Sequence, residues 1–234
     1  MERRGKNQQN RSRINRINME VQILNRNNSI ANSFLAELRD VSIQKDSMRF
    51  RKNIERLGWF LGYEASKSLN YQIQNVTTPL AEANENTVSD ALVVASVLRA
   101  GMPLHNGVLE IFDKAENAFV SAYRIENADG SLEFKIEYNA APNLEGKTLL
   151  LCDPMLATGN SMLLAYEALL KHGTPKQVII LSVIGSEKGV EFVKEKFPSN
   201  AKLIIGAVDP ILNEQSYIVP GLGDAGDLCY GSKE

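Results

Sequence analysis

The segment from Asp153 to Ser161, Asp-Pro-Met-Leu-Ala-Thr-Gly-Asn-Ser, carries the strongest chemical signal in the 234-residue chain. It follows an apolar run at 148–152 and precedes an amphipathic stretch, so it is expected to join a buried strand to a helix N-terminus. Unpaired main-chain N–H groups and the positive end of the helix dipole favour a phosphate there, and the Thr158 and Ser161 hydroxyls can add donors. Gly159 permits a close approach or a left-handed backbone angle.

The acid at the head of this segment suits a different part of a ligand. The carboxylate of Asp153 would repel a phosphate, so it is better suited to accept hydrogen bonds from sugar hydroxyls or to help a positive centre form. No GxxxxGK[ST] motif occurs, so a nucleoside-triphosphate P-loop is not indicated. By spacing alone the segment could also be an ordinary capped strand–helix turn, because Ser and Thr are common helix caps.

The surrounding pattern predicts an α/β fold with a parallel sheet. Four continuous apolar runs are interpreted as buried strands: 91–97, 148–152, 178–184 and 202–208. Helices are expected between them, at 101–112, 161–172 and 186–197. Buried strands that alternate with helices are typical of a parallel sheet covered on both faces. Strands at 118–124 and 132–138, joined by a turn at 127–130, are expected to form an antiparallel flap because the second alternates apolar and charged residues.

In such a sheet, ligands bind beyond the carboxyl ends of the strands. Arg99, Arg124, Asp153 and Asp209 each follow one of the expected strands, and a glycine-rich tail, 218–226, comes after the last. Two arginines, acids, hydroxyls and glycines therefore converge on one edge, where we expect the site.

The N-terminal region differs from the rest in composition. Residues 1–24 are rich in Arg, Asn and Gln, and we interpret them as a basic, mobile arm preceding a single domain at 25–234. A weak anion- or RNA-binding arm is the alternative, which the lack of interleaved aromatic residues disfavours. Two helices, capped near Ser29 and Asp46, are expected before the first strand, as a cap on the sheet or an oligomer surface.

Composition excludes several classes of protein. The net charge of −2 predicts no nucleic-acid partner, and two distant cysteines, Cys152 and Cys229, argue against a disulfide framework or a zinc knuckle. No secretory signal or membrane span is evident, so we predict a cytoplasmic protein. His105 and His172 lack partners at ligand spacing and are expected to have capping or surface roles, whereas Cys152, in its apolar strand, is expected in the core.

Several motifs resemble those of the uracil phosphoribosyltransferase family, among the type I phosphoribosyltransferases. The segment 153–161 is similar to the family's phosphoribosyl-diphosphate (PRPP) loop, and 98–101 (Leu-Arg-Ala-Gly) and 217–227 (Tyr-Ile-Val-Pro-Gly-Leu-Gly-Asp-Ala-Gly-Asp) are similar to two further motifs. The likeness runs from about residue 30 to the C-terminus. It implies a type I sheet with an antiparallel flap and two N-terminal helices, and transfer of the phosphoribosyl group of PRPP to uracil, giving UMP and diphosphate.

The resemblance also implies a role for each matched residue. PRPP would be bound by Arg99, Arg124, Asp153, Pro154, Met155, Leu156, Ala157, Thr158, Gly159, Asn160, Ser161 and Asp224. Within this set, 157–161 would hold the 5-phosphate, Asp153 would face the ribose hydroxyls, and the two arginines would contact the diphosphate. Uracil would lie against the main chain of Ile218, Gly223, Asp224 and Ala225. Asp153, Arg99 and Asp224 are the implied catalytic residues of an oxocarbenium-like transfer without a covalent intermediate; whether Asp224 contacts PRPP or orients the base stays open.

The chain departs from the family pattern at three places. Asn160 stands where a second glycine is common, and asparagine tolerates a left-handed backbone angle. Ala140-Ala141-Pro142 lacks a lysine found in many members, which bears on regulation more than on the reaction. Pro154 follows Asp153 where other type I members have a second acid, so Mg²⁺ is expected on the diphosphate of PRPP, with no protein-held metal site.

The expected partners are therefore uracil and PRPP, with GTP left open as an effector, in a homodimer or homotetramer without nucleic acid or membrane. Two alternatives remain at this point. One is a nucleotide-sensing, RNA-binding module on the same fold, and the other is an enzyme that uses a purine or orotate.

Overall fold

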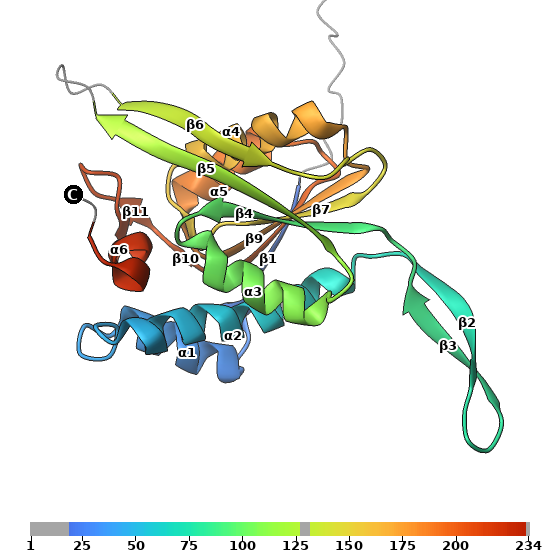
Figure 1. The fold of residues 1–234 in the computed structure, drawn as a ribbon. Coiled ribbons are helices and arrows are strands. Elements are labelled where there is room, and N and C mark those ends of the chain that lie inside the picture. The colour runs from blue at the N-terminus through green and yellow to red at the C-terminus, as the bar shows by residue number, and fades with distance from the viewer. Residues whose placement is uncertain (1–18, 127–131, 233–234) are drawn as a thin grey trace, which may run out of the picture.

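An eight-stranded sheet forms the centre of the molecule in the computed structural model, which describes residues 19–126 and 132–232 (Figure 1). Its order is β1-β10-β9-β7-β4-β5-β6, with β8 paired to β9. The strands are β1 (Glu20–Ile23), β4 (Leu92–Leu98), β5 (Glu116–Glu126), β6 (Leu132–Ala140), β7 (Thr148–Cys152), β8 (Met155–Leu156), β9 (Gln177–Ser186) and β10 (Lys202–Asp209). All neighbours are parallel except β5 and β6, which confirms the predicted parallel sheet and flap.

Helices cover both faces of this sheet (Figure 1). On one side lie α1 (Ile30–Arg39), α2 (Ser47–Ser66) and α3 (Gly101–Ile111), and on the other α4 (Asn160–Leu169) and α5 (Glu187–Lys196). Successive side chains of a strand point to opposite faces, so Leu150 joins the core under α1–α3, whereas Leu149 and Leu151 join the core under α4 and α5. This division explains why the central strands are apolar without alternation.

The first strand precedes the two N-terminal helices, contrary to the prediction that the helices come first. Glu20–Ile23 pair in parallel with Lys202–Ile205 of β10, and Met19 is buried. These residues therefore belong to the sheet and not to the arm expected at 1–24; residues 1–18 of that arm lie outside the described part. The reason is long-range: the edge of β10 supplies the hydrogen bonds that make this short segment a strand.

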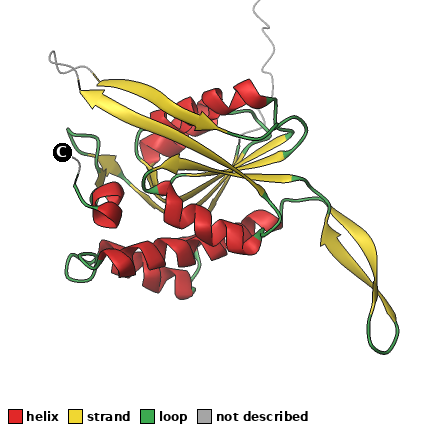
Figure 2. Cartoon of the chain, in the orientation of Figure 1, coloured by secondary structure: helices red, strands yellow, loops and turns green. Residues whose placement is uncertain are grey.

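A second element that the sequence analysis did not predict is a hairpin of β2 (Tyr71–Thr77) and β3 (Glu82–Val88), which extends away from the sheet (Figures 1 and 2). Every residue of β2 is exposed, and Leu80 in the turn is 98% exposed.

The described helices include none with the length and apolar character needed to span a bilayer.

After β10 the chain forms a small unit beside the sheet edge. It contains β11 (Ile211–Leu212), β12 (Ile218–Val219) and α6 (Ala225–Tyr230), and two 3₁₀ turns, Leu24–Arg26 and Leu170–His172, lie elsewhere in the fold. This C-terminal unit lies next to the ends of α1 and α2 (Figure 1), and α2 contacts α6.

Candidate active site

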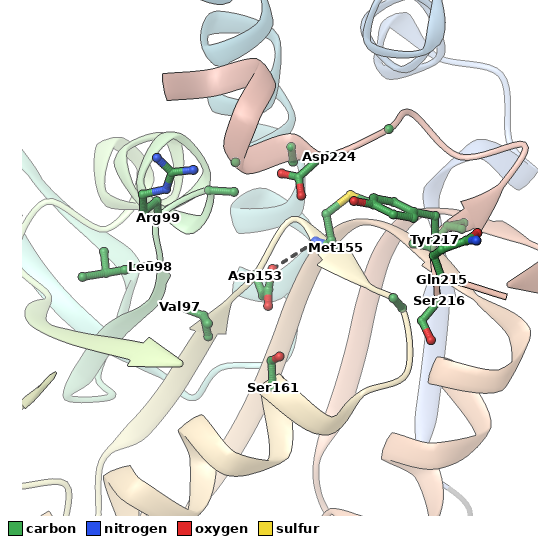
Figure 3. A pocket seen from close by; sticks show the side chains of 16 residues that line it. Val97, Leu98, Arg99, Asp153, Met155, Ser161, Gln215, Ser216, Tyr217 and Asp224 are labelled. Carbon is green, nitrogen blue, oxygen red and sulfur yellow. Dashed lines mark hydrogen bonds between the residues drawn. The ribbon is translucent and has the colours of Figure 1, made fainter. Parts of the chain in front are cut away.

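A pocket of about 330 Å³ lies at the carboxyl edge of the sheet (Figure 3). Three segments that are distant in sequence line it: Val97–Ala100 at the end of β4, the loop between β7 and α4, and the C-terminal tail. The loop contributes Asp153, Met155, Ala157 and Ser161, and the tail contributes Gln215–Ile218 and Gly223–Gly226. The structure thus brings together most of the chemistry-bearing segments expected at this edge.

The loop is held tightly at both of its ends. Gly159, the residue before α4, has φ +86°, and a Cβ there would lie 2.5 Å from a ring carbon of Phe192 in α5. Only glycine fits this left-handed and crowded position. Ser182 and Ser186 of β9 donate hydrogen bonds of 2.6 Å to the carbonyl oxygens of Asp153 and Ala157, respectively.

Those two serines are supporting residues that the sequence analysis did not identify. The available signal was a pair of hydroxyls, four residues apart, in an otherwise apolar strand. Both are buried, and a buried hydroxyl needs a hydrogen-bond partner. Their partners here are the main-chain carbonyls that set the course of the loop.

Asp153 lies at the base of the pocket, on the same side as Ser161 (Figure 3). Burial raises the pKa of its carboxyl group from 3.8 to about 7, against the opposing effect of a hydrogen bond of 3.1 Å from the Met155 N–H. Near neutral pH both the protonated and the ionised form of this carboxyl group are therefore populated. Hydroxyl donors from a ligand would favour the ionised form.

Arg99 follows β4, after a cis peptide bond with Leu98, and its guanidinium lies at the rim of the pocket. Its Nη2 is 3.2 Å from Oδ1 of Asp227 and 3.4 Å from the carbonyl oxygen of Gly231. The ion pair is half-exposed and hence weak. Among the described atoms, Nε of Arg99 is buried and has no hydrogen-bond partner. The guanidinium therefore has donor capacity left for an anion in the pocket.

The tail presents main chain to the pocket around two fixed points. The side chain of Ile218 is buried in the core, and Asp224 caps α6 by accepting a hydrogen bond of 2.9 Å from the Asp227 N–H. Gly223, with φ +91°, lies between them. Residues 218 and 223–226 all line the pocket, and at Gly223 and Gly226 the lining is main chain because glycine has no side chain.

The predicted residues divide into two groups. Those lining the pocket are Arg99, Asp153, Met155, Ala157, Ser161, Ile218, Gly223, Asp224 and Ala225. Those absent from the lining, among the residues whose side chains the structure describes, are Pro154, Leu156, Thr158, Gly159 and Asn160. Pro154, Leu156 and Gly159 are buried within the loop. Their predicted contacts with PRPP stay predictions.

Arg124 lies within β5, beyond Ser121, where pairing with β4 ends. The strand expected to end at this residue continues to Glu126, and the side chain of Arg124 lies outside the described part of the structure. Gln215, Ser216 and Tyr217 also line the pocket and were not assigned from the sequence. Tyr217 opens the motif at 217–227, which was the available signal.

The described residues include no group of three His, Cys, Asp or Glu side chains able to hold a metal ion. Among the described residues that line the pocket, two carry carboxylates, Asp153 and Asp224. This donor set does not fit a metal ion enclosed by protein ligands, which usually requires more oxygen donors.

Three other candidate groups lie in the core. For His105 this is contrary to the expected capping or surface role, because α3 turns this residue toward the sheet. His105 is buried with Nε2 2.7 Å from Oδ1 of Asn117, and burial lowers the pKa of its imidazole, although Asn117 opposes this. Cys152 and Cys229 are both buried free thiols; burial raises the pKa of each, that of Cys229 to about 12. Neither thiol is suited to act as a nucleophile.

The fold and site together have the architecture of a type I phosphoribosyltransferase. The sheet is parallel with an antiparallel flap, and its carboxyl edge carries a helix N-terminus, an arginine and the glycine-rich tail. Residues 25–232 match the sequence model described as "Uracil phosphoribosyltransferase". The chain belongs to the uracil phosphoribosyltransferase family, which confirms the resemblance drawn from its motifs.

Relatives and a solved structure agree with this assignment. The uracil phosphoribosyltransferase of Porphyromonas gingivalis is 51% identical over 215 residues, which cover 92% of this chain and 100% of the relative. That of Pyrococcus furiosus is 37% identical over 200 residues, 84% of each chain. The solved structure of the AQ2163 protein from Aquifex aeolicus is 31% identical, with a TM-score of 0.81 over 91% of this chain and 99% of that one.

Proposed function

We propose that the protein transfers the phosphoribosyl group of PRPP to uracil, forming UMP and diphosphate. The observation that carries the proposal is that a single pocket contains the loop before α4, the guanidinium of Arg99 and the open main chain of the tail. These three segments match the three parts of the reaction: the phosphorylated sugar, the leaving diphosphate and the base.

The loop is the proposed site of the phosphoribosyl group. The 5-phosphate would accept hydrogen bonds from main-chain N–H groups at 157–161, at the start of α4, and from the hydroxyls of Thr158 and Ser161. Asp153, at the base of the same pocket, would accept hydrogen bonds from the ribose hydroxyls in its ionised form. Arg99 would donate to the diphosphate, together with Arg124.

The tail is the proposed site of uracil. The base presents an acceptor–donor–acceptor edge, which main-chain N–H and C=O groups at Ile218 and 223–225 can match without side chains. The glycine at 223 allows the base to approach the backbone closely. Asp224 lines this end of the pocket, where it could contact either the base or the ribose, and both roles are kept.

The chemistry would be a direct substitution at the anomeric carbon. As diphosphate leaves, positive charge develops on the ribose and negative charge on the leaving group. Asp153 would face the former and Arg99 the latter, so catalysis would come from positioning and electrostatic stabilisation, without a covalent intermediate. Mg²⁺ would enter as part of the substrate, bound to the diphosphate oxygens.

A steady-state assay tests the proposal. The purified protein, given labelled uracil, PRPP and Mg²⁺, should form labelled UMP and diphosphate in equal amounts. Hypoxanthine and orotate in place of uracil should give no nucleotide. Absence of UMP, or turnover restricted to those other bases, would refute the assignment.

Three further features are part of the proposal. We expect a homodimer or homotetramer, which light scattering on the eluted protein would measure. GTP is the effector to test in the same assay, by its effect on the rate at low PRPP. A cytoplasmic location is retained as the prediction for a salvage enzyme of this kind.

A further inference from the structure

Two charged residues behind the tail form a partly buried ion pair that the mechanism does not use. Arg39 is the last residue of α1, and Asp209 is the last residue of β10. Nη1 and Nη2 of Arg39 are each 2.8 Å from a different carboxylate oxygen of Asp209, so the pair is bidentate. The Asp209 side chain is only 7% exposed, and neither residue lines the pocket.

Both members of the pair also bind the same residue of the tail. Oδ2 of Asp209 accepts a hydrogen bond of 2.8 Å from the Gly221 N–H, and Nη1 of Arg39 donates one of 3.0 Å to the Gly221 carbonyl oxygen. Gln44 adds a related contact, because its Nε2 donates to the carbonyl oxygens of Leu38 and Leu222. Charge-assisted and bidentate contacts of this kind fix geometry as well as adding energy.

The residue held in this way lies in the middle of the base-binding segment. Gly221 lies between Ile218 and Gly223, both of which line the pocket. Its φ is +62°, and a Cβ there would lie 1.9 Å from the Ile218 carbonyl oxygen, so the turn is as tight as glycine allows. Fixing both polar groups of this residue therefore fixes the main chain that precedes and follows it.

The pair is suited to this task because its charges are satisfied. Burial acts against the ionised carboxylate of Asp209, but the hydrogen bonds from Arg39 and from the Gly221 N–H outweigh it and lower the pKa. Removing the guanidinium of Arg39 would leave the buried carboxylate of Asp209 without a compensating charge. The tail would then shift so that this carboxylate could reach water or another partner.

We propose that Arg39 and Asp209 are positioning residues that align the base-binding main chain, and that they set the affinity for uracil without touching either substrate. The inference rests on the proposed function for the identity of the base. The proposal gives α1 a role in the active site, although Arg39 acts on the pocket indirectly, through its contact with Gly221.

Kinetics of Arg39→Lys and Asp209→Asn test this proposal. Lysine keeps the charge but cannot bind Asp209 and Gly221 in the same fork geometry. Because buried polar groups lose their partners, the KM for uracil should rise about tenfold or more in each variant. The KM for PRPP should stay within about twofold of wild type, since the loop is held independently by β9.

The matched control is a second bidentate pair, between Glu37 of α1 and Arg49 of α2. Nε and Nη2 of Arg49 lie 3.0 and 2.7 Å from the two carboxylate oxygens of Glu37, and this pair joins α1 to α2 without contacting the tail. Arg49→Lys should leave both KM values unchanged. If Arg39→Lys does not accumulate as folded protein, Gln44→Met tests the same segment. It removes the hydrogen bonds to the Leu38 and Leu222 carbonyl oxygens, and loss of the second, which is the one to the tail, should raise the uracil KM about threefold.

Uracil KM values within twofold of wild type in both Arg39→Lys and Asp209→Asn would overturn the proposal, and so would equal increases in the uracil and PRPP constants. Amide hydrogen exchange of the ligand-free protein separates this result from failure of the proposed function. In Arg39→Lys the peptide covering 217–226 should exchange about tenfold faster, while the peptide covering 153–161 should not change. Unchanged exchange at 217–226 would refute the inference even if the wild-type protein formed no UMP.

Discussion

Replacing Asp153 by asparagine should stabilise the ligand-free protein at neutral and alkaline pH. Burial raises the pKa of this carboxyl group from 3.8 to about 7, so the folded state binds the proton more tightly than the unfolded state. Below about pH 4 both states are protonated and the group has no effect on stability. Between about pH 4 and pH 7 the free energy of unfolding falls as pH rises, and above that range the full cost is present.

The size of the effect follows from the two pKa values. At about 1.4 kcal/mol per pH unit, the difference between 3.8 and about 7 corresponds to roughly 4 kcal/mol above pH 7. Water that enters the open pocket lowers this figure, so we expect about 2–4 kcal/mol. Between pH 5 and pH 8, where the unfolded state is already ionised, the gap between variant and wild type should widen by about 2 kcal/mol.

Urea denaturation at 25 °C, at a series of pH values between 5 and 8, measures this gap directly. The buffers should contain no phosphate, because phosphate is expected to bind the loop before α4 and to stabilise the folded state. The Asp153→Asn variant should be more stable than wild type at both ends of this range, by the full amount at pH 8 and by about 1–2 kcal/mol at pH 5, with an unchanged dependence on urea concentration. It should also lose most of its turnover.

Asp90→Asn provides a control of the opposite sign. Partial burial disfavours the charge of Asp90, but hydrogen bonds from Lys176 and Asn70 outweigh it and lower the pKa. Its contribution is present above its unfolded pKa and is lost only as pH falls through the lower folded value, so Asp90→Asn should cost stability by a constant amount between pH 5 and 8. A difference for Asp153→Asn that stays flat over the same range, or a loss of stability at pH 8, would refute the reasoning.

Three further outcomes can be checked separately. Arg99→Ala should reduce kcat/KM about hundredfold or more, because a donor to the leaving diphosphate is lost; near-normal kinetics would remove Arg99 from the site. Cys152 and Cys229 are buried, so neither thiol should react with a chromogenic disulfide reagent at pH 8 until denaturant is added. Rapid reaction of Cys229 in the native protein would contradict the placement of α6, to which this residue belongs. Amides of the β2–β3 hairpin should exchange hydrogen much faster than those of β7, since an isolated hairpin is only marginally stable; equal protection would mean that a second copy of the chain covers it.

Most of the central sheet could be predicted because its signal is local. The runs at 91–97 and 148–152 are apolar without interruption, and the structure places β4 and β7 within one residue of these bounds. The helix predicted after Asp46 begins there because the Asp46 carboxylate accepts a hydrogen bond from the Arg49 N–H. Burial of a strand on both faces requires an uninterrupted apolar run, and helix capping requires a polar residue at the helix N-terminus, so both can be recognised from neighbouring residues.

The elements that were not predicted have no such local sequence pattern. Glu20–Ile23 becomes a strand only because β10 offers an open edge, 182 residues further along the chain at its first pair. The hairpin at 71–88 is rich in Asn, Gln and Glu, and its two strands are exposed along most of their length, so burial imposes no apolar pattern on them. Its pairing depends on the partner strand and not on burial.

The site shows the same distinction at the level of single residues. Asp153, Arg99 and the tail were found because each belongs to a compact motif, and the sheet brings those motifs to one edge. Asp209 was expected at that edge too, yet its carboxylate is used by Arg39 and Gly221 behind the pocket. Arg39 and Asp209 are 170 residues apart, and no local spacing links them.

The two ends of the pocket are supported by different parts of the fold. The loop before α4 is fixed by hydroxyls of β9, a central strand of the sheet. The tail has only a two-residue ladder with β11, so side chains from elsewhere must hold it. Arg39 and Gln44 reach it at 221–222, while Arg51 of α2 donates a hydrogen bond of 2.5 Å to the Cys229 carbonyl oxygen at the other end of α6. The N-terminal segment at 30–66 thus fixes the proposed base end of the pocket and leaves the proposed phosphate end to the sheet. Mutations in α1 and α2 that reach the tail should therefore change selectivity for the base before they change affinity for PRPP.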